Sequence, residues 1–406
     1  METSDIIYRE IISEEAGVWY ISDITGSKIL IKVPSTTIKL IVKKCKLQLL
    51  FGKEEQDNLC YLHIGLNVFD SEQNPLSLIH VCKHDFEQIA IKEIINLDEI
   101  YVEFFNELDI CIIKSFIILD QKDKKGIIKF IETKKKYYID YNINSIAAEL
   151  SLNNFQYTVD DKIKISNAYK INLLKIDISL KDIIIMDSVF IGYNENNKIT
   201  INTDNEGKLL ENIAWAPLQS VFGENIYKNP QVNFKNKLRE LTDILAYYQN
   251  GIFLIETKSL SVINMDNIEI NKQVDKLKKH IKKAIDQLVG AKKVIERQEK
   301  VFDIHTKKEI PVIHTDNPIH CIILVENIYP FGNWKDIINI ICQTIKKEGI
   351  FLHILDLTEY IKLIKYSKGK IELIDYNLMM RCKLFVETRN IFIKGKQKLQ
   401  DKKISL

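Results

Sequence analysis

The chain has 406 residues, of which 46% are hydrophobic and 28% charged, and its formal net charge at pH 7 is +2. A chain of this length is too long to fold around one ordinary hydrophobic core, so we expect two domains. The composition is that of a soluble globular protein. No apolar run reaches the roughly 18 residues of a membrane helix, and the acidic first segment does not resemble a secretory signal. The small net charge gives no information about binding partners. We therefore expect a cytoplasmic protein that makes no membrane contact.

The first half of the chain reads mostly as short strands separated by polar turns. The clearest strands are expected at 29–33, 37–42, 59–69, 110–119 and 126–133. This pattern predicts a β-rich domain over residues 1–204, which we interpret as a recognition or regulatory module. A stretch rich in Asn and Asp at 193–207 supplies the boundary, placed near residue 204.

After residue 206 the sequence pattern changes from short strands to helices that alternate with strands. Helices are expected at 208–222, 272–298, 334–348 and 357–367, with a hairpin at 241–258 and strands at 319–326 and 350–355. Strands that alternate with helices indicate parallel pairing, so we expect a two-domain α+β or α/β protein whose second domain covers 205–393. A lysine-rich tail, 394–406, is expected to be disordered, and non-specific attraction to nucleic acid is the alternative role that its charge leaves open.

The strongest functional signal lies in RELTDILAYYQNGIFLIETKSL, residues 239–260. Asn250-Gly251 predicts a two-residue hairpin turn, because such a turn needs positive φ at both positions. If this pair is the loop, Asp243 faces Lys258, and Glu256 lies diagonal to Asp243. Side chains alternate along a strand, so these three polar residues share one face.

Two carboxylates placed side by side repel each other, and a divalent cation relieves that repulsion. Carboxylate oxygens are hard ligands that suit Mg²⁺ or Mn²⁺, so Asp243 and Glu256 are the candidate metal ligands. Lys258 can orient or help to deprotonate a water that attacks phosphorus in line. The pattern therefore predicts metal-dependent hydrolysis of a phosphodiester.

Asp243, followed by a turn and Glu256-Thr257-Lys258, resembles the PD-(D/E)XK signature of restriction-endonuclease-like nucleases. The segment 242–259 is similar to the nuclease-related and Mrr-like branches, although Thr242 stands where a proline usually precedes the acid. The resemblance covers about 206–300, and more loosely the strands to 355. It implies a core of helix, three strands, helix and strand.

The resemblance also implies two further catalytic residues. An acid is often present on the first helix, where Glu211 is our candidate and Glu206 and Glu224 remain open. A Gln or Lys often follows on the helix after the E-x-K strand, where Gln287 is the match.

The long helix expected at 272–298 has an apolar stripe flanked by a basic face. The stripe repeats at three- and four-residue spacing and comprises Val274, Leu277, Ile281, Ala284, Leu288, Ala291 and Ile295. Lys276, His280, Lys283 and Gln287 are spaced to share a neighbouring face. Residues 272–300 contain ten Lys or Arg and four Asp or Glu. A basic face beside a carboxylate site would hold a phosphate backbone, although the face taken alone reads as a solvated helix surface.

Each signal also has a plainer interpretation. The three polar residues could form a solvated hairpin face with a cross-strand ion pair. A second triplet, Glu132-Thr133-Lys134, shows how common E-x-K is in this chain. We reject it as the site because Asp120, at the end of the preceding strand, lies at a turn and no long amphipathic helix follows.

Histidine and cysteine clusters are interpreted as structural. Five residues between 60 and 84 invite a zinc site (Cys60, His63, His80, Cys82 and His84). Strand alternation separates Cys60 from His63, so packing is favoured. His314, His320 and His353 have no acidic partner at metal-ligand spacing. The seven scattered cysteines contain no C-x-x-C pair and are expected to be reduced.

We therefore expect a Mg²⁺- or Mn²⁺-dependent endonuclease that acts on nucleic acid, DNA rather than RNA. A recognition module joined to such a nuclease suggests, by analogy, a microbial antiviral defence or DNA-processing effector. A homodimer, or a partner protein bound through residues 1–204, is a further expectation. The alternatives are a catalytically inactive scaffold that keeps the nuclease fold, and an unrelated α/β interaction protein with a chance motif.

Overall fold

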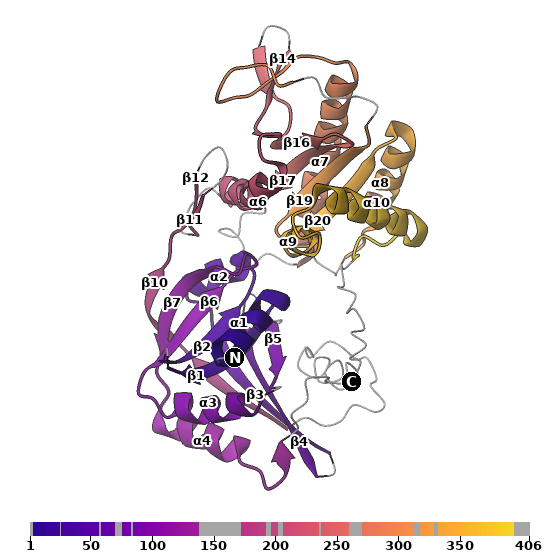
Figure 1. Cartoon of the computed structure of the whole chain (residues 1–406). Coiled ribbons are helices and arrows are strands. Elements are labelled where there is room, and N and C mark those ends of the chain that lie inside the picture. The colour runs from indigo at the N-terminus through magenta and orange to yellow at the C-terminus, as the bar shows by residue number, and fades with distance from the viewer. Residues whose placement is uncertain are drawn as a thin grey trace, which may run out of the picture. The chain divides into compact units, whose positions relative to one another are not determined.

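In the computed structural model the chain forms two compact units, Met1–Ser188 and Val189–Leu406 (Figure 1). The structure describes residues 3–24, 26–56, 58–69, 75–82, 84–137, 172–191, 196–201, 206–234, 237–259, 270–311, 317–328 and 332–393. Both units mix helices with sheets, so the chain is a mixed α/β protein. The division precedes the boundary expected near residue 204, and the basic tail 394–406 lies outside the described residues.

The described residues of the first unit form two sheets. One has the order β1-β2-β6-β7-β10 and the other β5-β4-β3-β9, with β8 paired to β4. The strands are β1 Gly17–Asp23, β2 Gly26–Lys32, β3 Leu47–Gln56, β4 Leu59–Val68, β5 Leu76–Val81, β6 Ile100–Phe105, β7 Cys111–Ile117, β8 Lys136–Tyr137, β9 Asn172–Ile178 and β10 Leu180–Ile185. The helices are α1 Thr3–Ser13, α2 Ser35–Val42, α3 Asp85–Ile95 and α4 Gln121–Ile131.

Two strands expected in this unit are helices. Residues 37–42 lie in α2. The backbone N–H of Ser35, the first residue of this helix, donates a hydrogen bond to the Glu107 carboxylate at 2.8 Å. That partner lies 72 residues away, so no local pattern reveals it. Residues 126–131 lie in α4, whose N-cap Asp120 accepts a hydrogen bond from the Asp123 backbone at 2.7 Å. The stretch 120–126, read as a turn, is therefore a helix start.

The second unit is built on a five-stranded sheet of order β13-β16-β17-β19-β20. Its strands are β13 Ile226–Lys228, β16 Ile244–Tyr248, β17 Gly251–Lys258, β19 Ile319–Val325 and β20 Phe351–Asp356. β16 and β17 are antiparallel, whereas β17, β19 and β20 are parallel neighbours joined through helices. Two small sheets accompany it, β11 Ser188–Ile191 with β12 Asn196–Ile199, and β14 Gln231–Phe234 with β15 Lys237–Glu240 and β18 Val301–Phe302.

Helices cover both faces of the five-stranded sheet (Figure 1). They are α6 Glu206–Phe222, α7 Ile270–Glu296, α8 Lys335–Glu348, α9 Leu357–Tyr366 and α10 Ile371–Thr388. The seven apolar residues expected to line α7 are all buried in one cluster with Leu245, Leu254 and Cys321 of the sheet, which confirms that stripe. The opposite face of the sheet packs against α6, where the rings of Phe222 and Phe253 contact edge-on with their centroids 5.1 Å apart. α10 was not expected from the sequence and lies along β20, the strand at the sheet edge.

Across the described parts of the chain, no helix combines the length and apolar character needed to cross a membrane.

Candidate active site

The hairpin that carries the candidate site has a different turn from the one expected. Tyr248 pairs with Gly251, so the two-residue loop is Gln249-Asn250. A Cβ on Gly251 would lie 2.7 Å from the Tyr248 ring and 3.2 Å from the Asp375 carboxylate. Glycine is therefore required here for close packing, and not for turn geometry. The observed pairing differs from the expected one by two residues, and because strand side chains alternate, each stays on its expected face.

Neither face of this hairpin is a solvated surface. Leu245 and Leu254, on the same face as the acids, are fully buried against α7. The observed register, continued by one residue beyond Ile244–Ile255, places Asp243 across from Glu256 and not across from Lys258. The two carboxylates are thus closer neighbours than the sequence analysis expected.

Asp243 is fixed by the strand opposite. Its Oδ2 accepts hydrogen bonds from the Thr257 backbone N–H at 2.5 Å and from the Thr257 hydroxyl at 2.8 Å. The neighbouring Thr242 hydroxyl donates to the Ile255 carbonyl at 2.8 Å. These bonds tie the start of β16 to the end of β17. Thr242, which stands where the motif that this hairpin resembles usually has proline, thus has a structural role of its own.

Glu256 is 1% exposed and its Oε2 lies 2.6 Å from the Lys258 ammonium. Its pKa is raised to about 7, first by burial and then by repulsion from Asp243, although the charge of Lys258 and its hydrogen bond oppose the rise. A single ammonium is therefore insufficient to stabilise both carboxylates in this buried position.

Two more acids complete the cluster. Glu211 on α6 has a raised pKa, caused by burial and next by the charge of Asp243, with Lys228, Lys258 and Lys208 acting in the opposite direction. Of the three helix acids left open, Glu224 lies in the exposed turn after α6, and the side chain of Glu206 is outside the described residues.

Glu240, at the end of β15, was missed by the sequence analysis. Much of this residue is exposed, yet its carboxyl is hydrogen-bonded to Asp243. Its pKa is raised to about 7 by partial burial, by that hydrogen bond, and by repulsion from Asp243, Glu256 and Glu211. The only local hint was an acid three residues before Asp243, because β15 belongs to a separate small sheet whose position the sequence pattern does not reveal.

The basic face of α7 lies near these acids. The pKa of His280 is lowered by burial and then by the charges of Lys276, Lys258 and Lys283. Since Lys258 belongs to β17, this coupling places His280 in its electrostatic neighbourhood, and Lys276 and Lys283 lie beside His280 on α7. One turn further along, the Gln287 side-chain oxygen is buried and has no hydrogen-bond partner.

The chemistry of the donor set fits a divalent cation. Glu211, Glu240, Asp243 and Glu256 are acids, and the raised pKa values of Glu211, Glu240 and Glu256 are caused in part by repulsion within this set. Within the described residues, no three His, Cys, Asp or Glu side chains are already arranged to hold an ion. An incoming cation at Asp243 and Glu256 would share Glu256 with the Lys258 ammonium, which lies 2.6 Å from Oε2, or displace it.

The rejected triplet and the histidines lie elsewhere in the chain. Glu132 is the exposed C-cap residue of α4, in the first unit, and Thr133 donates a hydrogen bond to Glu55 at 3.2 Å. His320 does have an acidic partner, Asp375 of α10, at 2.8 Å, which the sequence spacing did not reveal. His320 also contacts His353 at 3.3 Å and stacks between Phe253 and Phe351, so it forms part of a buried polar core.

No protein-family model matches the chain, and no curated protein sequence matches it significantly. Among solved structures, it is similar to the small subunit of the heterodimeric restriction endonuclease R.BspD6I. That similarity has 14% sequence identity and a TM-score of 0.23, and it covers 44% of this chain and 88% of that subunit.

Proposed function

We propose that the second unit is a Mg²⁺- or Mn²⁺-dependent endonuclease that hydrolyses phosphodiester bonds of nucleic acid, DNA rather than RNA. The observation that carries this proposal is the buried Glu256, which pairs with Lys258 and lies across from Asp243. Burying carboxylates that repel each other is costly, and perturbed acids of this kind concentrate at functional sites.

Each residue has a role in the proposal. Asp243 and Glu256 would hold the cation, which supplies charge stabilisation to the reacting phosphate. Thr257 keeps Asp243 in place through the two hydrogen bonds to its Oδ2. Lys258, when released from Glu256, orients the attacking water and takes part in its deprotonation. Glu211 and Glu240 complete the negative field, and Gln287 offers an unpartnered oxygen to an ordered water.

Charge distribution supports a nucleic acid as the substrate. The formal charge is −6 for residues 1–188 and +8 for 189–406, which together give the net +2 of the chain. Lys276, His280 and Lys283 would contact phosphates beside the acids, and the whole basic unit would attract a polyanion. The first unit remains our candidate for recognition or regulation, in keeping with a defence or DNA-processing effector.

The proposal is tested with purified full-length protein on supercoiled plasmid, linear duplex, single-stranded DNA and RNA, with Mg²⁺ or Mn²⁺. Asp243→Asn, Glu256→Gln and Lys258→Ala should each lower the cleavage rate by about 100-fold or more. The matched controls are Glu132→Gln and Lys134→Ala, which change the same E-T-K triplet in the first unit and should leave cleavage intact. Equal behaviour of the wild type and the three site variants on every substrate would refute the proposal.

A non-catalytic scaffold with the same fold is the second candidate, favoured by the Lys258 ammonium that already occupies Glu256. The two candidates differ in metal binding. An enzyme should gain thermal stability with Mn²⁺, and Asp243→Ala should abolish that gain. A protein with no metal-linked stabilisation and no cleavage is the scaffold.

A further inference from the structure

The outer face of α10 presents a continuous apolar stripe. Leu373, Tyr376, Met380 and Leu384 are between 40% and 55% exposed. Their spacing of three, four and four residues places them on one side of the helix. The inner side carries a second apolar set, including Ile374, Leu378, Cys382 and Phe385, which is buried. α10 is therefore apolar on two opposite faces, of which the fold of the second unit covers one.

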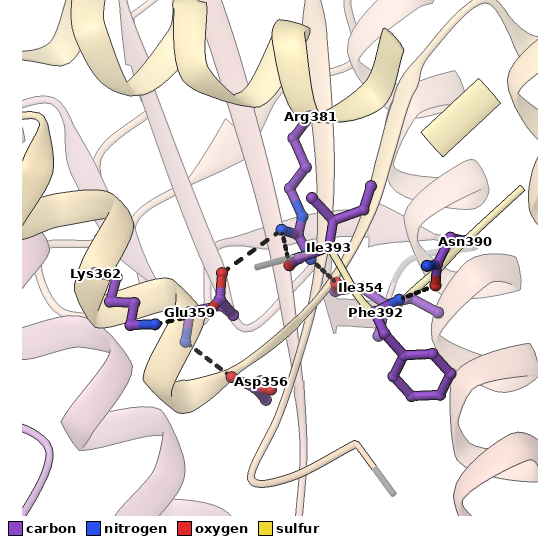
Figure 2. Close-up of polar contacts among 8 residues, drawn as sticks. All are labelled: Ile354, Asp356, Glu359, Lys362, Arg381, Asn390, Phe392 and Ile393. Atoms are coloured by element: carbon purple, nitrogen blue, oxygen red, sulfur yellow. Dashed lines mark hydrogen bonds and ion pairs between the residues drawn. The ribbon is translucent and has the colours of Figure 1, made fainter. Parts of the chain in front are cut away.

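The inner face of α10 is firmly attached to the sheet, so the stripe is presented on a fixed helix. Asp375 accepts a hydrogen bond from Tyr248 and contacts His320 at 2.8 Å. Figure 2 shows Arg381 reaching from α10 to the Ile393 carbonyl at 2.5 Å, the Ile354 carbonyl at 3.4 Å and Glu359 of α9 at 3.8 Å. Glu359 is itself held by Lys362 at 3.2 Å.

Charges at the ends of the stripe are arranged in a self-complementary way. Lys370 directly precedes α10 and Glu387 lies in its last turn, and both are exposed. If two copies of α10 pair antiparallel about a two-fold axis between residues 378 and 379, Leu373 lies opposite Leu384 and Tyr376 lies within one residue of the position opposite Met380. The same axis brings Lys370 of each copy to Glu387 of the other, whereas a parallel pair would join like charges.

We propose that the outer face of α10 is a two-fold symmetric interface with a second copy of this chain. The four side chains expose on the order of 400 Å² per copy, about half of the ~800 Å² per partner in a standard interface. The helix pair alone therefore gives a weak, concentration-dependent dimer. This inference is independent of whether the acid cluster is catalytic.

The test is sedimentation of the full-length protein over about 1 to 200 µM, where the wild type should shift from 47.4 kDa toward twice that mass. Tyr376→Glu combined with Met380→Glu should abolish the shift. Ile89→Glu, at an exposed apolar position of α3 in the first unit, is the matched control and should leave it unchanged. Thermal unfolding of every variant confirms that it is folded.

A charge exchange distinguishes self-pairing from any other cover of this face. Lys370→Glu or Glu387→Lys alone should weaken the dimer about three- to ten-fold, because each creates two like-charge contacts per dimer. The double variant should recover wild-type affinity, because the exchanged charges still meet across the axis. A monomer at all concentrations would overturn the proposal and would indicate that a different protein or another segment of the chain covers α10. A dimer that is insensitive to the stripe and charge variants would overturn it equally.

Discussion

The buried carboxylate Glu256 predicts that the metal-free protein is less stable at pH 8 than at pH 5.5. Its pKa rises from an ordinary value of 4.5 to about 7 on folding. Between these values the folded state holds a proton that the unfolded chain has released, so stability falls as pH rises through this window and levels off above pH 7. Glu256 is 1% exposed, so solvent screening is slight. A shift of this size corresponds to about 3 kcal/mol at most over the whole window, of which about 2 kcal/mol lies between pH 5.5 and pH 8.

The assay is urea unfolding in EDTA at pH 5.5 and pH 8, followed by tryptophan fluorescence. Trp19→Phe serves as the background, because the two remaining tryptophans, Trp215 and Trp334, both lie in the second unit. Glu256→Gln should remove its own part of the loss between pH 5.5 and pH 8 and leave a smaller part that comes from Glu240, and Mn²⁺ should reverse the loss in the protein that keeps Glu256. Equal stability at both pH values in EDTA, or the same pH dependence in Glu256→Gln, would refute the inferred repulsion.

Three further predictions follow from particular contacts. Gly251→Ala should lower the free energy of unfolding by about 1–3 kcal/mol, because its Cβ would clash with Tyr248. Gly290→Ala, in open space on α7, should raise it by about 0.5–1 kcal/mol. Thermal unfolding compares the two variants, and a similar effect at both positions would contradict the packing argument. Asp375→Asn should destabilise the second unit by about 2–3 kcal/mol at pH 7. Burial would raise the pKa of Asp375, but His320 and Tyr248 hold it below its ordinary value of 3.8, so the stabilisation is present above that value and is lost as pH falls through the folded pKa. A penalty that does not diminish as the pH is lowered below 3.8 would argue against this linkage. Replacing Lys276, His280 and Lys283 by Ala should weaken DNA binding and reduce the salt dependence by roughly 0.9 per lost phosphate contact, measured by fluorescence anisotropy at several salt concentrations, while Lys346→Ala on α8 should have little effect.

The second unit was more predictable from sequence than the first. The expected helices near 208–222, 272–298, 334–348 and 357–367 each correspond to an observed helix within two residues. Their long three- and four-residue periodicity is a strong local signal. In the first unit, α2 and α4 were read as strands, because β-branched and isoleucine-rich runs resemble strands when the capping partner is distant or unrecognised.

The sequence by itself determined which polar residues share a face of the hairpin, because alternation of side chains is a local property that a two-residue change of register preserves. It also determined the apolar stripe of α7 and the basic residues beside it. Only the tertiary structure decided that Gln249-Asn250 forms the turn, because the close approach of Tyr248 and Asp375 to Gly251 depends on α10 packing against the sheet. Tertiary structure alone also brought Glu211 and Glu240 to Asp243, since a carboxylate's neighbours, and hence its pKa, depend on distances in space and not along the chain.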